Sequence, residues 1–236
     1  MNHIFIRKLA LTLASVSFSI MMALAMLCSA AYGETVSTRE NSVKAQENEM
    51  QSDGTEYPIS CTSLVIENLA SYDGAFYEDG SGREVLNVAA LMVRNDSNRV
   101  IPYAHITVET EDASYIFDAT VLPPNSRVLI PEKNGRILSN SEIIDYFGWN
   151  TVKDKSSQIG VKVYDTKQWG ICLYNISDNA MSDLTVFYRT YIEDGDFYMG
   201  GKAFQTVISK IDAGESVDII PQYYASGYSR VVFMES

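Results

Sequence analysis

The chain has 236 residues, with 18 Lys and Arg against 30 Asp and Glu, and a formal net charge of −12. This acidic excess argues against nucleic-acid binding, in which Lys and Arg displace counterions from phosphates, and against binding to an anionic membrane surface.

The N-terminus has the pattern of a secretory signal peptide. Arg7 and Lys8 precede an uncharged apolar stretch, residues 9–31, and a small-x-small cleavage pattern follows it. We therefore expect a signal peptide at residues 1–33 and a secreted or envelope-associated protein. The alternative is a membrane anchor formed by residues 9–31, because an uncharged, mainly apolar stretch of 23 residues is long enough to span a bilayer.

The segment after the predicted cleavage site has the composition of a disordered linker. Residues 34–56 are rich in Glu, Gln, Ser and Asn, and they hold too few apolar side chains to offset the entropy of ordering the chain. Removal of residues 1–33 leaves 16 basic and 30 acidic residues, a net charge of −14. The folded part is then about 180 residues long, which is room for one large or two small domains.

Two segments of the folded part repeat each other. LMVRNDSNRVIPYAHITV at 91–108 and ICLYNISDNAMSDLTVFY at 171–188 each hold an apolar strand, an Asn-x-Ser, a turn and a second strand with Thr-Val. Downstream, LPPNSRVLIP at 122–131 matches IDAGESVDIIP at 211–221. The common order and spacing predict two sibling domains.

Asn95 and Asn175 stand at equivalent places in the two copies. Both match the glycosylation sequon, together with Ser97 and Ser177. Their equivalence favours a simpler role, in which the Asn and Ser side chains hydrogen-bond the local backbone at the end of a strand.

Each copy has the pattern of antiparallel strands, with short runs rich in Val, Ile, Tyr, Phe and Thr between turn residues. The predicted strands are 64–69, 85–94, 105–110, 115–121 and 127–130 in the first copy, then 159–164, 170–174, 184–191, 202–209, 216–220 and 230–234 in the second. This spacing predicts an all-β fold of two tandem immunoglobulin-like antiparallel β-sandwiches, with domain 1 at 57–134 and domain 2 at 157–236.

The segment between the two domains is predicted to contain a short helix. Ser141 is a capping residue, acidic and apolar residues follow it through Phe147, and Gly148 supplies a stop. We place the helix in an interdomain connection at 135–156. Trp149 and its aromatic neighbours are too apolar for a free linker, so we expect them to pack against one or both domains.

The repeated pattern resembles a known group of small domains. An Asn-x-Ser after an apolar strand, a Phe with a Thr nearby (Phe117 and Thr120; Phe204 and Thr206) and a turn with Ser before another apolar strand are similar to FxLYD-like immunoglobulin-like domains. These domains occur in exported proteins of Gram-positive anaerobic bacteria. The Phe-x-Leu-Tyr-Asp string itself is absent. The resemblance covers both domains and implies their fold, but it transfers no site residues.

The sequence has no pattern of an enzyme. After residue 33 it holds one histidine, His105, and it contains no Gly-x-Ser-x-Gly, no P-loop and no dinucleotide-binding fingerprint. We therefore predict no catalytic residue, no cofactor and no metal site. The acid-rich stretches 73–79 and 193–196 are alternatives for Ca²⁺, with solvated hairpin turns as the simpler interpretation. Cys61 and Cys172 are expected to be unpaired, because a bridge between them would have to cross domains.

Aromatic residues are the feature that points to a ligand, since the chain has 15 Tyr. The possible ligand-stacking residues are Tyr223, Tyr224, Tyr228, Phe197 and Tyr198. The alternative is that these rings serve in the core as strand-forming residues. We expect an exported, non-enzymatic protein that binds an unknown protein or cell-wall glycan, or that serves as a structural part of the envelope. The alternative function is a carbohydrate-binding module that uses exposed Tyr, Phe and Trp rings.

Overall fold

The computed structural model describes residues 55–151, 160–166 and 170–236, all within one compact unit that spans Ala45–Ser236. The predicted signal peptide at 1–33 and nearly all of the predicted linker at 34–56 lie outside these residues. The described ranges contain strands and no helices, which confirms the predicted all-β class. The same ranges contain no helix with the length and hydropathy needed to cross a membrane.

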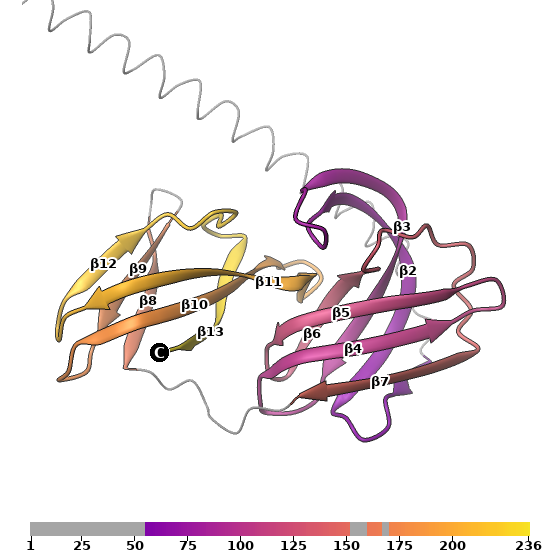
Figure 1. The fold of residues 1–236 in the computed structure, drawn as a ribbon, viewed down its shortest axis with the longest axis horizontal. Helices are drawn as coiled ribbons and strands as arrows, with labels where there is room; N and C mark the ends of the chain where they lie inside the picture. Colours follow the sequence, from indigo (N-terminus) through magenta and orange to yellow (C-terminus); the bar gives the residue numbers. More distant parts are fainter. Residues whose placement is uncertain (1–54, 152–159, 167–169) are drawn as a thin grey trace, which may run out of the picture. The chain divides into compact units, whose positions relative to one another are not determined.

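Thirteen strands form in the described part of the chain (Figure 1). In chain order they are β1 (Tyr57–Pro58), β2 (Leu64–Phe76), β3 (Arg83–Asn95), β4 (Ile101–Glu109), β5 (Ser114–Leu122), β6 (Ser126–Pro131), β7 (Asp145–Thr151), β8 (Val161–Asp165), β9 (Ile171–Asn175), β10 (Met181–Ile192), β11 (Phe197–Ile211), β12 (Ser216–Ile219) and β13 (Ser229–Glu235).

These strands pair into one large sheet and two small ones. The large sheet has the order β1-β2-β3-β6-β11-β10-β13, and the small sheets have the orders β5-β4-β7 and β12-β9-β8. Neighbouring strands are antiparallel except β6 and β11, which pair in parallel where Val128 faces Tyr198 and Leu129 faces Met199. This short parallel contact joins N-terminal and C-terminal strands in one sheet.

The order of pairing is the same in the N-terminal and C-terminal parts of the chain. Strands β2-β3-β6 and β5-β4-β7 pair in the first part, and β8-β9-β12 and β11-β10-β13 pair in the second. Asn95 ends β3 and Asn175 ends β9. The repeated sequence pattern therefore goes with a repeated strand order.

Asn95 and Asn175 form matching networks of hydrogen bonds, and both residues are buried. The Nδ2 of Asn95 donates to the carbonyl oxygens of Arg99, Leu122 and Pro123, at 2.9, 3.4 and 2.8 Å. The Nδ2 of Asn175 donates to those of Asn179, Ile211 and Asp212, at 2.8, 3.1 and 3.2 Å. In each network the Asn Oδ1 accepts the N–H and the hydroxyl of the Ser two residues later. The predicted backbone-bonding role of these residues is confirmed.

Apolar side chains fill the space between facing sheets. One core lies between strands β2-β3-β6 and the β5-β4-β7 sheet, and it includes Leu64, Leu91, Ile106, Phe117 and Ile130. Another core lies between the β12-β9-β8 sheet and strands β11-β10-β13, and it includes Ile171, Leu173, Leu184, Val186 and Tyr188. Period-2 burial along β5 shows how the sequence directs one face of a strand to the core.

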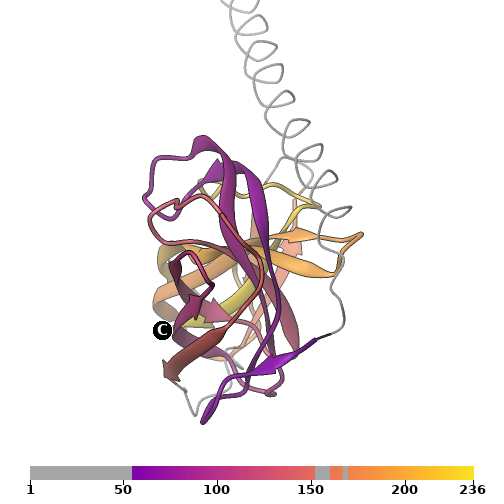
Figure 2. The ribbon, with the colours of Figure 1, turned by 90° about the vertical axis from the view of Figure 1, so that its right-hand side faces the viewer.

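The β2–β3 hairpin is longer than the sequence runs predicted. Each strand has 13 residues, against predicted strands at 64–69 and 85–94. Register shifts between Ile66 and Asn68 and between Tyr72 and Gly74 interrupt the alternation that marks a strand. Such bulges also bend a strand, and the hairpin curves along its length (Figure 1, Figure 2).

The predicted helix after Ser141 is wrong. Residues Asp145–Thr151 form β7, which pairs antiparallel with β4, and exposure alternates at every residue along it. Gly148 does not stop a helix, because it lies mid-strand, where an added Cβ would come within 2.9 Å of the carbonyl oxygen of His105. The aromatic residues of this segment favour a strand, and pairing along the edge of β4 outweighs a weak capping signal.

Arg189, on β10, connects strands from the two parts of the chain. Its side chain is buried and donates to the carbonyl oxygens of Thr120 and Val121 on β5 and of Gly200 and Gly201 on β11. Burial lowers the pKa of Arg189 to about 10, although the charge of Glu78 opposes this shift. The guanidinium therefore remains charged at neutral pH. Glu78 is also buried, and its Oε1 accepts the N–H of Gly201 at 2.7 Å.

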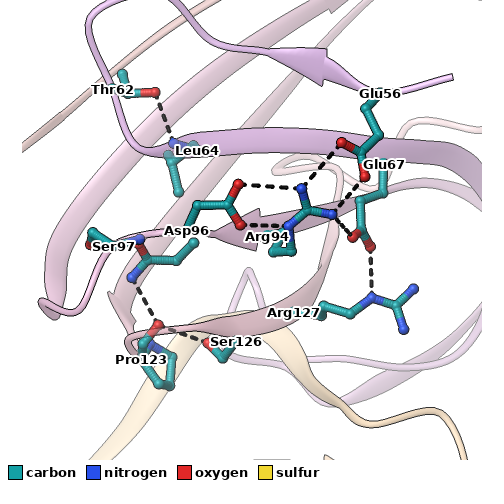
Figure 3. Close-up of polar contacts among 11 residues, drawn as sticks. Glu56, Thr62, Leu64, Glu67, Arg94, Asp96, Ser97, Pro123, Ser126 and Arg127 are labelled. Atoms are coloured by element: carbon teal, nitrogen blue, oxygen red, sulfur yellow. Dashed lines mark hydrogen bonds and ion pairs between the residues drawn. The ribbon is translucent and has the colours of Figure 1, made fainter.

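A second polar network surrounds Arg94 on β3 (Figure 3). The Arg94 guanidinium contacts the carboxylates of Glu56, Glu67 and Asp96 at 2.7, 2.6 and 2.5 Å. Glu67 also accepts the Nε–H of Arg127 at 2.6 Å, and Arg127 Nη1 donates to the carbonyl oxygen of Gly195 at 3.1 Å. Because Gly195 lies between β10 and β11, this network also reaches from the first part of the chain to the second.

The repeated segments 122–131 and 211–221 each bury an aliphatic residue, so we predict that Leu122→Ala and Ile211→Ala destabilise the protein to a similar degree. Both side chains are buried at the end of a strand. Loss of a buried Leu or Ile costs about 2–5 kcal/mol, because a cavity remains. Chemical denaturation of the complete chain measures the change in unfolding free energy. Glu215→Ala changes an exposed residue of the second segment and is the control, so its unfolding free energy should stay within about 0.5 kcal/mol of the parent protein. Unchanged stability in Leu122→Ala would contradict the structural role of the segment 122–131.

Candidate functional site

The outer face of the β5-β4-β7 sheet brings together aromatic and charged side chains. His105 on β4 stands opposite Asp118 on β5 and opposite Trp149 on β7. Tyr103 lies two residues before His105, on the same face of β4, and Lys133 reaches Asp118 from the segment after β6. We call these five residues the Trp149 face.

Trp149 is the most exposed ring of this face. Trp149 as a whole residue is 52% exposed, and its ring centroid lies 5.2 Å from that of Tyr103 and 6.0 Å from that of His105. The indole and imidazole planes are within 28° of parallel. Contacts with two neighbouring rings hold the indole against the sheet while half of the residue stays in solvent. Phe147 lies two residues earlier on β7 and is also exposed.

Asp118 fixes the polar groups of the face. Its Oδ1 accepts the hydroxyl of Tyr103 at 2.9 Å and lies 2.7 Å from Nδ1 of His105. Its Oδ2 lies 2.6 Å from Nζ of Lys133. Burial by itself raises the pKa of Asp118, but the bonds from Lys133, His105 and Tyr103 outweigh burial and lower the pKa below its usual value. An ionised Asp118 requires the proton of a neutral His105 on Nδ1, which leaves Nε2 as an acceptor.

This arrangement has the components of a binding surface. It offers an aromatic ring for stacking, and it holds an ammonium, an imidazole and a phenol in place through one carboxylate. Polar groups with fixed positions lose little freedom when a ligand arrives, which favours binding. The chemistry suits a ligand that has both an apolar face and hydroxyl groups.

The residues predicted to stack on a ligand lie elsewhere, and they do not form one exposed row. Phe197 and Tyr224 are buried, so neither ring is open to solvent. Tyr198 packs partly buried against the first core. Tyr223 and Tyr228 are partly exposed. Tyr223 also packs on the rings of Tyr77 and Phe204, with centroids 5.2 and 5.1 Å away. Stacking on a ligand stays a prediction for Tyr223 and Tyr228.

In the acid-rich stretch 73–79, two aspartate side chains accept hydrogen bonds from the backbone of their own hairpin. Asp73 accepts the N–H of Asn87 at 2.6 Å, and Asp79 accepts that of Ser81 at 2.9 Å. Within residues 55–151, 160–166 and 170–236 no group of three or more His, Cys, Asp or Glu is placed to hold a metal ion. Cys61 and Cys172 are both free, as predicted.

Sequence reasoning missed the Trp149 face, because its residues come from four separate segments. The register of β4 with β5 and β7 brings four of them together, and Lys133 joins them from the segment after β6. One signal was available, since Phe147 and Trp149 alternate with Tyr146 and Gly148 in the period of a strand. Because the segment was predicted to be a helix, in which residues two apart do not share a face, the common face of Phe147 and Trp149 was not predicted.

No protein-family model matches the chain, and a search of curated proteins returns no match. The geometry of the described residues is therefore the basis for a proposal about function.

We predict that Asp118→Asn lowers the unfolding free energy by about 1–2 kcal/mol at pH 7, because charge-assisted hydrogen bonds are lost at a mostly buried group. The folded-state pKa of Asp118 is depressed, so its contribution is present above the unfolded pKa, near 3.8, and is lost as pH falls through the folded value. Urea denaturation at pH 7 and at pH 3 should show a difference that shrinks in acid.

The matched control is Asp112→Asn, a change of the same kind in the exposed turn between β4 and β5. It should leave the unfolding free energy within about 0.5 kcal/mol of the parent protein. A difference between Asp118→Asn and the parent that stays constant from pH 7 to pH 3 would show that the Asp118 charge does not stabilise the face.

Proposed function

We propose that the protein is an exported, non-enzymatic carbohydrate-binding protein of two immunoglobulin-like domains, and that the Trp149 face binds the carbohydrate. The N-terminal sequence pattern supports export. The shared strand order and the matching networks of Asn95 and Asn175 support two related domains. The resemblance to FxLYD-like domains agrees with this architecture. In this proposal β7 completes a sheet of the first domain.

The half-exposed indole of Trp149 beside fixed polar groups carries the proposal. The C–H groups of a sugar ring bear a small positive charge, and an aromatic face bears a negative one, so the two attract when they stack. The hydroxyl groups of the sugar then need donors and acceptors at the ring edge. Lys133 supplies charged donors, and His105 supplies a polar nitrogen.

The same face favours a glycan over a purely structural role in the envelope. A spacer needs a stable fold and no particular surface chemistry. Here one carboxylate orients three different side chains around an exposed indole. Such an arrangement restricts the rotamers of long side chains, which has an entropy cost that binding can offset.

We predict that Trp149→Ala weakens glycan binding at least tenfold, a change of about 1.4 kcal/mol. A panel of cell-wall and plant polysaccharides in affinity electrophoresis identifies the ligand, and calorimetry with an oligosaccharide of that ligand then measures affinity. Tyr164→Ala is the matched control, because Tyr164 on β8 is 51% exposed against 52% for Trp149 but lies on a different sheet. Equal effects of the two substitutions, or no retention by any polysaccharide of the panel, would contradict the proposal.

A further inference from the structure

A cleft of about 410 Å³ lies between β4 and β5 on one side and β10, β11 and β13 on the other. Its volume falls in the range of small-ligand pockets, roughly 300–1,000 Å³. The apolar side chains that line it are Val100, Pro102, Val121, Phe187, Ala203 and Phe233. This cleft is separate from the Trp149 face, and no residue belongs to both.

Two phenylalanines form the middle of the cleft. Phe187 on β10 stands opposite Phe233 on β13, and their ring centroids lie 5.9 Å apart. Gln205 on β11 stands opposite Phe187 on its other side and brings an amide to the same row. A ligand that lies across this row meets apolar ring surface with one hydrogen-bonding group beside it.

Opposite charges lie toward the two ends of the cleft. Glu235 faces Thr185, and Thr185 faces Val207 on β11. Lys202 is five residues from Val207 on the same strand, at about 3.3 Å per residue. Because the pairing of β11 with β10 is irregular between Met199 and Phe204, the two charged residues lie at most about 16 Å apart along the strand direction. The row of Phe187 and Phe233 lies between them.

The walls of the cleft are held in place before any ligand binds. Thr120 and Val121 form part of one wall, and their carbonyl oxygens accept hydrogen bonds from the buried guanidinium of Arg189. The hydroxyl of Thr120 also accepts the N–H of Ala203 on the opposite wall, at 2.9 Å. Nζ of Lys202 donates to the carbonyl oxygen of Glu78, which limits where that ammonium can lie.

We propose that this cleft binds a short apolar peptide with free ends, three or four residues long. An extended chain spans at most about 3.3–3.6 Å per residue, so four residues reach about 14 Å, and the Lys and Glu side chains cover the rest. The peptide ammonium lies near Glu235 and the peptide carboxylate near Lys202. Its apolar side chains contact Phe187 and Phe233. The inference does not depend on carbohydrate binding at the Trp149 face.

Isothermal titration calorimetry with trileucine tests this proposal on the complete folded chain. We expect trileucine to bind, N-acetyl-trileucine to bind at least tenfold more weakly because it lacks the ammonium, and trileucine amide to bind at least tenfold more weakly because it lacks the carboxylate. Equal affinity for the three peptides would overturn the assignment of the charged ends. No detectable binding of trileucine would overturn the site.

Two substitutions test which residue binds each end of the peptide. Glu235→Gln should weaken trileucine binding and remove the penalty of acetylation, and Lys202→Gln should remove the penalty of amidation. Lys210→Gln is the control, because it makes the same charge change on β11 with a side chain that pairs with Asp212. The acetylation penalty persisting in a folded Glu235→Gln would contradict the proposed orientation. If a variant fails to fold, the three peptides on the parent protein still decide the question.

Discussion

The buried guanidinium of Arg189 is the interaction on which the arrangement of the described strands depends. A charge without water is costly, and it is tolerated only when hydrogen bonds and an opposite charge replace the lost solvation. Arg189 meets this condition with four backbone carbonyls from β5 and β11, and Glu78 balances its charge. The planar fork of arginine suits several acceptors at once, which the single ammonium of lysine does not.

This interaction connects the core to both surfaces that we propose as binding sites. Strand β5 carries Thr120 and Val121, which bind Arg189 and line the cleft, and it carries Asp118 two residues earlier, which orients the Trp149 face. Because Arg189 holds β5 in place, it also fixes the position of Asp118 and of the side chains that Asp118 orients. The parallel pairing of β6 with β11 and the bond from Arg127 to Gly195 act in the same direction. Apart from Lys133 and Val100, the residues of both proposed sites lie on strands. Side chains on strands hold their positions better than side chains on loops.

The sequence allowed the fold class and many strands to be predicted, because alternation in segments such as 115–121 has one clear physical cause, a strand with one buried face. It also allowed the role of Asn95 and Asn175 to be predicted from their equivalent positions. Strand ends were predicted less well, since the bulges at Asn68 and Gly74 interrupt the pattern. The helix prediction failed because capping signals are local, whereas β7 forms by pairing with β4. The sites were missed for a related reason, as the Trp149 face and the cleft join residues distant in sequence.

Substitution of Arg189 tests most directly whether a buried charge holds the described strands together. Chemical denaturation of the complete chain, followed by circular dichroism, gives the unfolding free energy of Arg189→Met against the parent protein. We expect a loss of about 3–5 kcal/mol, because the carbonyls and Glu78 remain buried without their partner. Arg83→Met removes an arginine from an exposed pair with Asp79 and should cost no more than about 1 kcal/mol. An Arg189→Met protein as stable as the parent would contradict this account.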